Sequence, residues 1–142
     1  MKYLLDTCVI SEFVSRRPNP QVIVWLDQIP ESRLFLSVVT LGEIRKGVVR
    51  LPASERKDQL AEWLAEELPF RFDSRILPVD AEVMQAWGDL AGSCEAKGQP
   101  MPDLDAIIAA TAACHHMTLV TRNEADFQHA GIPILNPWKS SH

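Results

Sequence analysis

Four acidic residues stand where the chain is expected to pass into a helix. Asp6 directly follows the apolar segment 3–5, and the other acids are Glu43, Asp105 and Asp126. In an open α/β sheet, ligands collect in the crevice at the carboxyl ends of the strands, so we expect the four side chains to meet there. Carboxylate oxygens are the ligands that Mg²⁺ and Mn²⁺ prefer in proteins. The pattern therefore predicts a divalent metal site.

Such a site would suit the hydrolysis of a phosphodiester. Crowded carboxylates repel one another, and a divalent cation relieves that repulsion. The cation also lowers the pKa of a water and neutralises charge on a phosphate. We expect Asp6 and Asp105 to hold the metal directly and Glu43 to bind it or to orient a water. Asp126 would support a water or a second ion.

Each acid also has a purely structural interpretation. Asp6 is placed to cap a helix, although Thr7 can do the same work. Glu43 completes the capping-box pattern that begins at Thr40, in which the glutamate bonds back to the amide of the cap residue. Asp105 stands in a first helical turn, where the helix dipole favours acids. No single position is decisive, and the joint pattern is what favours a site.

Four further residues are candidates for supporting roles. Asp103 is interpreted as a helix cap or as a support behind the metal ligands. Thr7 and Thr121 are candidate phosphate contacts, or supports for the acids. Asn123 is a candidate helix cap, and it offers another oxygen at the same strand end as Asp126.

Alternating strand and helix patterns predict a parallel sheet built from βαβ units. The expected strands are 3–5, 33–37, 75–79, 118–121 and 132–135. Helices are expected at 7–14, after Asn19, at 40–51, at 54–68, from Asp80 to Gly98, and at about 103–116. Pro69 is expected to stop the fourth of these helices. The fold class is α/β: one three-layer α/β/α domain over residues 1–142, with a helical hairpin at 40–68.

Charge is distributed unevenly along the chain. The net charge of the 142 residues is -5. Residues 1–75 balance 11 basic against 11 acidic residues, whereas residues 76–142 hold 3 basic and 8 acidic ones. A divalent cation would cancel part of that excess. A basic cluster near Glu43 forms either a phosphate-facing rim or an ordinary solvated surface; its members are Arg45, Lys46, Arg50, Arg56 and Lys57.

Several other classes of protein are disfavoured. No apolar run approaches the roughly 20 residues of a membrane-spanning helix, and no secretory signal pattern is present, so a cytoplasmic location is expected. The three cysteines, Cys8, Cys94 and Cys114, are widely spaced and are expected to be buried thiols. Neither a Gly-rich phosphate loop nor a GxSxG elbow occurs.

The chain resembles the PIN-domain family, and within it the VapC-type (FitB-like) toxins of prokaryotic toxin–antitoxin modules. Five short motifs match in order: LLDTCVISE at 4–12, LSVVTLGEIRKGV at 36–48, DAIIAATA at 105–112, LVTRNEADF at 119–127 and NPW at 136–138. Cys8 stands where the family usually carries Asn.

The resemblance implies a PIN-like fold and a ribonuclease that depends on Mg²⁺ or Mn²⁺ and cuts tRNA or rRNA, which inhibits translation. Its acids carry over as Asp6, Glu43, Asp105 and Asp126. Some relatives carry an acid where Asn123 stands, so the fourth ligand is either Asn123 or Asp126. The resemblance also implies a homodimer, or a larger hetero-oligomer with a VapB-like antitoxin whose C-terminal segment fills the groove near the acids. Promoter DNA would be bound only through that antitoxin.

Three functions follow as hypotheses. The leading one is a metal-dependent endoribonuclease. The second is an antitoxin-binding interaction module with a weak or inactive nuclease site, which the hairpin at 40–68 motivates. The third is a phosphatase with an aspartyl nucleophile, but such enzymes usually need a second Asp two residues after the first, where Cys8 stands. The sequence does not specify the RNA, the antitoxin, the oligomeric state or the number of metal ions.

Overall fold

The computed structural model describes residues 1–139, so the last three residues of the expected domain lie outside the described part of the chain. A sheet of five parallel strands forms the centre of the molecule, in the order β3-β2-β1-β4-β5. The strands are β1 (Tyr3–Leu5), β2 (Leu34–Ser37), β3 (Ile76–Leu77), β4 (Thr118–Val120) and β5 (Ile134–Leu135). The predicted parallel sheet is confirmed, and β1 lies at its middle, between β2 and β4.

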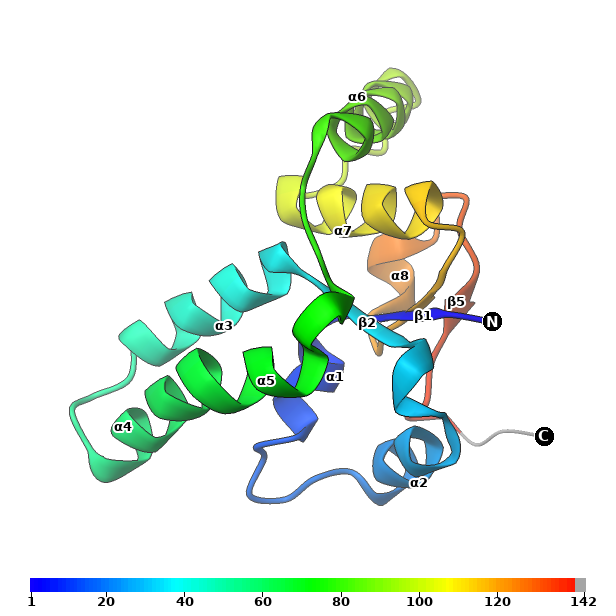
Figure 1. Ribbon diagram of the computed structural model, residues 1–142. Coiled ribbons are helices and arrows are strands. Elements are labelled where there is room, and N and C mark those ends of the chain that lie inside the picture. The colour runs from blue at the N-terminus through cyan, green and yellow to red at the C-terminus, as the bar shows by residue number, and fades with distance from the viewer. Residues whose placement is uncertain (140–142) are drawn as a thin grey trace.

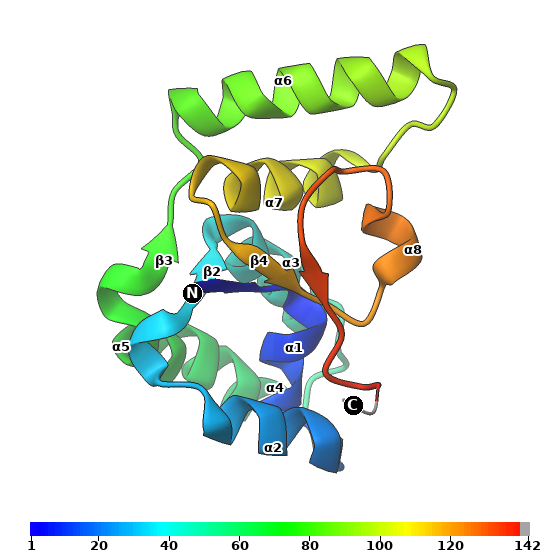
Figure 2. The same cartoon turned by 90° about the vertical axis from the view of Figure 1, so that its right-hand side faces the viewer.

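Helices cover both faces of this sheet, as Figures 1 and 2 show. On one face lies α7 (Asp103–Cys114), with α6 (Ala81–Ala96) packed outside it. On the other face lie α1 (Thr7–Glu12) and α2 (Pro20–Gln28). Successive residues of β1 point to opposite faces: Leu4 packs in the core cluster that contains Ile108 of α7, and Leu5 packs in the cluster of α1 and α2. The three-layer α/β/α class is confirmed.

The predicted helical hairpin is formed by α3 (Val38–Val49) and α4 (Glu55–Glu62), which lie side by side in Figure 1. The expected start of α3 at Thr40 is wrong. The helix begins two residues earlier, because the Ser37 hydroxyl at the end of β2 accepts a hydrogen bond from the Val39 amide and caps it (3.0 Å). Thr40 therefore lies inside the helix, and the expected capping box does not exist.

Pro69 does not stop the helical chain, which is a second correction. After α4 the backbone widens into a π-helical turn at Trp63–Glu67 and continues as α5 (Leu68–Phe72). A proline has no amide hydrogen and its ring crowds the carbonyl four residues earlier. We attribute the continuation to the wider π turn, which makes room for the ring. The extension buries Leu68 and Phe72.

Other boundaries differ by a few residues from those expected. The third strand is limited to β3, because a short 3₁₀ turn occupies Asp73–Arg75 (η3). A similar turn, Glu31–Arg33 (η1), precedes β2, and α8 is the short helix Glu124–Phe127. Asp80 caps α6 as expected, and Gly98 follows its end with a positive φ of 70°, which glycine adopts freely. The helices α1 and α7 and strand β5 are each two residues shorter than expected.

The cysteines are unpaired, but only Cys94 is fully buried. Cys8 and Cys114 are partly exposed, so the expectation of three buried thiols is wrong for both. Within residues 1–139, no helix is both long and apolar enough to cross a membrane.

Candidate active site

Asp6 lies at the carboxyl end of the central strand and is held from two sides. Its side chain is only 5% exposed. One carboxylate oxygen, Oδ1, accepts from the Thr7 amide at 2.8 Å, and Oδ2 accepts from the Thr121 hydroxyl at 2.8 Å. The residue at the cap of α1 is thus Asp6 and not Thr7. Because Thr121 follows β4, this contact ties together the ends of two neighbouring strands.

Burial raises the pKa of Asp6 above its ordinary value, since removal from water disfavours the charged form. Hydrogen bonds from Thr121, Thr7 and Cys8 oppose that effect, whereas the negative charge of Asp126 adds to it. The carboxylate is therefore oriented by donors but lacks a cationic partner among the residues that the structure describes. A cation placed nearby would therefore stabilise the charged form of Asp6.

Glu43 is drawn toward the same place by Thr7. The Thr7 hydroxyl donates to Oε1 of Glu43 at 2.5 Å and lies 3.2 Å from the buried Thr40 hydroxyl. This contact replaces the expected bond from Glu43 back to the Thr40 amide. It connects the start of α1 to the middle of α3, two segments more than 30 residues apart in sequence. Glu43 therefore faces the end of β1 instead of closing its own helix.

Asp105 is half-buried in the first turn of α7, and its pKa is raised to about 6. Burial is the main cause, and the negative charges of Asp6, Glu43 and Asp126 add to it in that order. All three acids are therefore close enough to act on Asp105. The structure brings together four carboxylates that are spread along the sequence from Asp6 to Asp126, at the carboxyl ends of the strands.

The remaining predicted residues lie at the margin of this group. Asp126 and Asn123 are exposed at the start of α8. Asn123 occupies the cap position of α8, but its side chain makes no capping bond, and its amide donates to the Thr121 hydroxyl at 3.0 Å. Asp103 is exposed and does not cap α7, because Pro102 occupies the cap position. The expected capping roles of Asn123 and Asp103 are therefore wrong.

Thr121 and Cys8 form the floor behind Asp6. Thr121 is fully buried, so its hydroxyl holds Asp6 and is not accessible to a phosphate. The Cys8 sulfur lies 3.8 Å from Oδ2 of Asp6 and 3.7 Å from the Thr121 hydroxyl. Burial, together with the charge of Asp6, raises the pKa of the Cys8 thiol, although bonds and charge from Arg122 oppose this. The thiol is therefore protonated at neutral pH and acts as a weak donor.

The donor set fits a hydrated divalent cation. Within residues 1–139, no three His, Cys, Asp or Glu side chains stand close enough together to enclose a metal ion directly. Mg²⁺ does not require such a cage, because it keeps several waters and binds through one or two carboxylates. Asp6 and Asp105 supply hard oxygen atoms, and a cation would favour their charged forms, which burial first and neighbouring negative charge second disfavour.

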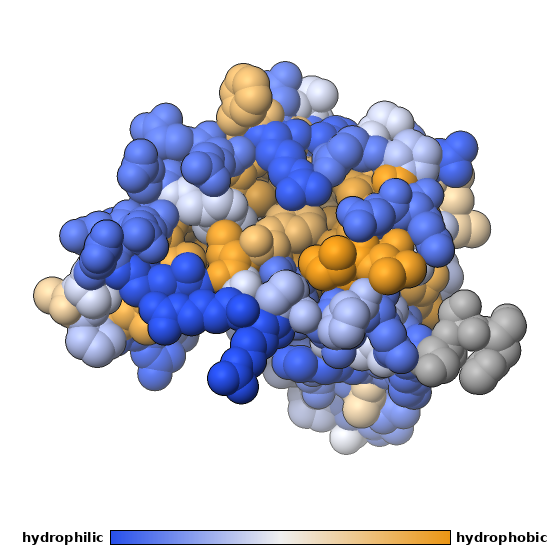
Figure 3. Space-filling model, turned by 90° about the horizontal axis from the view of Figure 1, so that it is seen from below, coloured by the Kyte–Doolittle hydropathy of each residue, from blue (hydrophilic) through white to orange (hydrophobic). Residues whose placement is uncertain are grey.

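A groove leads away from this site along the hairpin. It encloses about 530 Å³ and begins at Thr7 and Glu43. Its apolar wall comes from α3, α4 and the residues beside them, namely Ile44, Val48, Leu51, Leu60 and Trp63. The face shown in Figure 3 also carries apolar side chains across its middle, bordered by hydrophilic ones. The acids Asp6 and Glu43 thus lie beside a groove that is mainly apolar along the hairpin.

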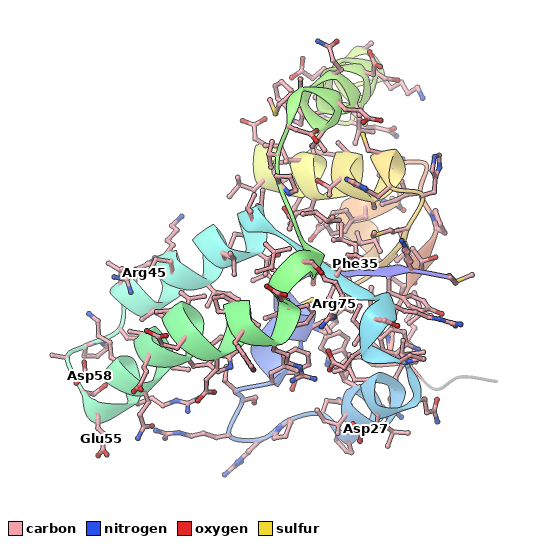
Figure 4. The ribbon with its side chains drawn as sticks, in the orientation of Figure 1. Asp27, Phe35, Arg45, Glu55, Asp58 and Arg75 are labelled. Carbon is pink, nitrogen blue, oxygen red and sulfur yellow. The ribbon has the colours of Figure 1, made fainter. Side chains whose placement is uncertain are left out.

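The basic cluster of the hairpin is only partly available to a phosphate. The Arg56 guanidinium donates to the Val14 carbonyl, and the Lys57 ammonium donates to the carbonyls of Val49 (3.2 Å) and Leu51 (3.0 Å). Lys57 thus closes the turn between α3 and α4, and Arg56 connects α4 to the segment after α1. Arg45 lies on the outside of the hairpin, as Figure 4 shows, and Lys46 and Arg50 are also exposed. A solvated surface accounts for this cluster better than a phosphate rim.

Two residues near the site were not singled out by sequence reasoning as functional. Arg122 follows Thr121 directly and lines the groove, and its guanidinium lies 5.1 Å from the ring centre of Trp138. One feature of the sequence could have identified Arg122: it comes immediately after a strand whose end carries site residues. Nothing in the sequence indicated that Trp138 would lie beneath it.

The chain was compared with known proteins. The PIN domain family matches residues 3–133. The chain is 34% identical to VapC ribonuclease Y4jK of Sinorhizobium fredii over 96% of this chain and 97% of the relative. It is 36% identical to toxin FitB of Neisseria gonorrhoeae over 95% and 97% of the two chains.

Among solved structures, FitAB bound to an IR36 DNA fragment contains a chain that superposes with a TM-score of 0.91 at 36% identity. The match covers 99% of this chain and 98% of that one. The agreement in fold extends over the same strands and helices that carry the acidic site. From its sequence and its fold, this chain belongs to the PIN-domain family.

Proposed function

We propose that this chain is a metal-dependent endoribonuclease and the toxin component of a type II toxin–antitoxin system. The observation that carries the proposal is Asp105, a half-buried acid whose pKa is raised to about 6 by burial and by three neighbouring carboxylates. Such a cluster is costly unless a cation binds there. The relatives named a VapC ribonuclease and a toxin support the assignment of the activity.

We propose a separate role for each acid in binding the metal or a water. Asp6 and Asp105 hold Mg²⁺ or Mn²⁺, and Glu43 either binds the ion or orients a water. The fourth position belongs to Asp126 or to the Asn123 amide oxygen, both exposed beside the site. When bound, the cation supplies charge neutralisation at the phosphate and a water of lowered pKa.

The hydroxyl groups fix the positions of the acids. Thr121 keeps Oδ2 of Asp6 in place, and Thr7 keeps Oε1 of Glu43 turned toward the end of β1. Neither acid then has to be ordered when the substrate arrives, which is a main advantage of a preorganised site. We propose tRNA or rRNA as the substrate class, with inhibition of translation as the consequence.

A protein partner is part of the same proposal. The groove beside Glu43 has an apolar wall and charged ends, and we propose that the C-terminal segment of a VapB-like antitoxin fills it and blocks the acids. The FitAB structure on DNA motivates the further proposal that promoter DNA is bound through the antitoxin. The chain would act as a homodimer or in a larger hetero-oligomer.

The direct test is the substitution Asp6→Asn, with Asp27→Asn as the matched control. Asn caps a helix as well as Asp does, so the fold should be retained. Asp27 is exposed on α2, away from the acids (Figure 4). We expect Asp6→Asn to lower RNA cleavage by at least about a hundredfold, since even residues behind a metal ligand cost about 10- to 100-fold. Equal cleavage by Asp6→Asn and the wild type, with contaminating nuclease excluded, would reject the assignment.

A second readout does not depend on activity. Calorimetric titration with Mn²⁺ should show binding by the wild type and Asp27→Asn, and at least about tenfold weaker binding by Asp6→Asn. The apolar wall of the groove favours one competing function, an antitoxin-binding module with an inactive site. No Mn²⁺ binding at millimolar concentration, with antitoxin binding retained, would support that module instead. Mapping transcript 5′ ends after induction of the wild type and of Asp6→Asn would identify the RNA target.

A further inference from the structure

Arg122 borders both hollows at the acidic site. It lines the groove that contains Thr7 and Glu43, and it also lines a second hollow of about 510 Å³ that contains Asn123 and Asp126. Its charge reaches Cys8 on the floor of the site, where it acts against burial on the thiol. Arg122 is therefore shared by the two hollows, so a strand that occupies both would pass beside it.

The position of Arg122 is fixed from below by an aromatic ring. The guanidinium carbon lies 5.1 Å from the centre of the Trp138 ring, within the range of a cation–π contact. Asn136 orients this segment: its Oδ1 accepts from the Trp138 amide at 2.9 Å, and its Nδ2 donates to the Arg122 carbonyl at 3.4 Å. A stacked guanidinium keeps its edge donors available while losing much of its freedom.

The other cations that line these hollows are already engaged. Arg56 donates to the Val14 carbonyl, and the Lys139 ammonium lies 2.6 Å from Oε2 of Glu124. Among residues 1–139, the Arg122 side chain makes a ring contact but neither a hydrogen bond nor an ion pair. Its N–H donors therefore remain free at the two hollows that contain Glu43 and Asp126, whose negative charges would otherwise repel a polyanion.

We infer that Arg122, stacked on Trp138, binds a backbone phosphate of the RNA substrate at the rim of the acidic site and so positions the strand for cleavage. The inference rests on the proposed ribonuclease function and adds a positioning residue to it. A guanidinium matches a phosphate with two parallel N–H···O bonds, which an ammonium does not. Because the site is acidic, a single fixed cation at its rim has a large influence on where a phosphate settles.

The test compares Arg122→Gln with Arg33→Gln, which removes an exposed arginine at the opposite edge of the sheet, at the start of β2. For cleavage of a single-stranded RNA oligonucleotide, Arg122→Gln should raise KM about tenfold and leave kcat within about twofold, because a charge-assisted hydrogen bond is lost in binding. Arg122→Lys should recover only part of the affinity. Mn²⁺ affinity should not be weakened in any of these variants.

Binding without cleavage gives a sharper readout. In an Asp6→Asn background, the logarithm of the association constant for the oligonucleotide falls linearly with the logarithm of the salt concentration. Arg122→Gln should reduce that slope by about 0.7, the value for one phosphate contact to a single strand. Arg33→Gln should leave the slope unchanged. Trp138→Leu should raise KM by about threefold through loss of the stacked position.

The outcomes separate the two proposals. A wild type that cleaves RNA, together with an Arg122→Gln variant whose KM and salt slope match those of Arg33→Gln, would overturn the inference and leave the proposed function intact. A lower melting temperature of Arg122→Gln with unchanged KM would assign Arg122 a structural role only. Loss of antitoxin binding with unchanged KM would assign it to a protein partner. A wild type that neither cleaves nor binds the oligonucleotide rejects both proposals.

Discussion

Charged side chains are balanced in opposite ways at the two ends of the strands. At the amino end of β2, Glu31 faces two arginines, with Arg71 Nη2 at 2.5 Å from Oε1 and Arg75 Nη2 at 3.2 Å from Oε2. Burial opposes ionisation of Glu31, but the bond and charge of Arg71 and the charge of Arg75 outweigh it and lower the pKa. At the carboxyl end, burial and three like charges raise the pKa of Asp105 to about 6.

This difference separates a structural cluster from the proposed metal site. Arg75 also donates to the carbonyls of Glu31 (2.6 Å), Leu34 (2.6 Å) and Arg71 (2.6 Å), and its guanidinium lies 4.9 Å from the Phe72 ring centre. Each of these three charged groups has a partner within the chain. The acids at the other end of the strands accept from hydroxyl and amide donors but form no ion pair within residues 1–139, so their burial and mutual repulsion lower stability until a cation binds. The predictions below, from the largest expected effect to the smallest, test that contrast.

Divalent cations should stabilise the fold only through the acidic edge. At a Mn²⁺ concentration about 100 times the dissociation constant, the free energy of unfolding should rise by about 2.7 kcal/mol. Denaturant unfolding with Mn²⁺ and with chelator measures this increase. Asp6→Asn should remove about half of it or more, whereas Glu31→Gln should retain all of it. An equal increase in Asp6→Asn and the wild type would place the ion elsewhere.

Arg75→Met should damage the paired edge without affecting the other. Three backbone carbonyls would lose their donor, so the free energy of unfolding should fall by about 2 kcal/mol. Urea unfolding measures the change, and Arg33→Met serves as the control. Mn²⁺ affinity measured by calorimetry should stay at the wild-type value. A drop in that affinity would mean that the two edges are coupled.

Mn²⁺ binding should depend on pH through Asp105. Its pKa of about 6 means that protons compete with the metal below that value. Affinity should be nearly constant above pH 7 and should fall by about fivefold from pH 6 to pH 5, as one proton must be displaced. Glu31→Gln should follow the wild-type profile throughout. A flat profile between pH 5 and pH 7 would contradict the assigned role of Asp105.

In the absence of metal, neutralising one acid at each end of the strands should change the free energy of unfolding in opposite directions. Asp105 has a higher pKa in the folded state than its unfolded value of 3.8, so its ionised form destabilises the fold above pH 6. Asp105→Asn should therefore raise the free energy of unfolding at pH 7.5 by about 1 kcal/mol, a value reduced for the solvent screening of a half-buried carboxyl. That gain should vanish as the pH falls below the unfolded pKa.

Glu31→Gln should instead lower the free energy of unfolding. The lowered pKa of Glu31 means that its contribution is present above its unfolded value of 4.5 and is lost as the pH falls through the folded value. Because the pair is largely exposed, the loss at pH 7.5 should be a few tenths of a kcal/mol to about 1 kcal/mol. Unfolding with chelator present, at pH 7.5 and at pH 3.5, measures both variants. If both variants changed the free energy of unfolding in the same direction at pH 7.5, the contrast between paired and unpaired charges would be contradicted.

Local patterns were sufficient to predict the framework of the fold. The alternation of strand and helix, the cap at Asp80 and the stop at Gly98 were predicted from neighbouring residues. These features depend on capping atoms and backbone preferences within a few positions. The positions of the acids relative to strand ends followed from the same patterns.

Contacts between distant segments explain where prediction failed. Glu43 matched a capping box, but Thr7 from another helix binds its carboxylate instead. Pro69 matched a helix stop, but the burial of Phe72 beyond it accompanies a continued helix with a π turn. For Glu43 a tertiary contact outweighed a local preference, whereas for Pro69 a wider helical turn removed the clash on which the expected stop depended.

The sequence by itself determined which residue types stand at the strand ends, and in what order, because those choices are made by local periodicity. Only the tertiary structure decided that Asp105 lies within the field of three other acids and that Arg122 stacks on Trp138. Burial and charge coupling arise between segments that meet only on folding, since the strength of both depends on distance and on exclusion of water.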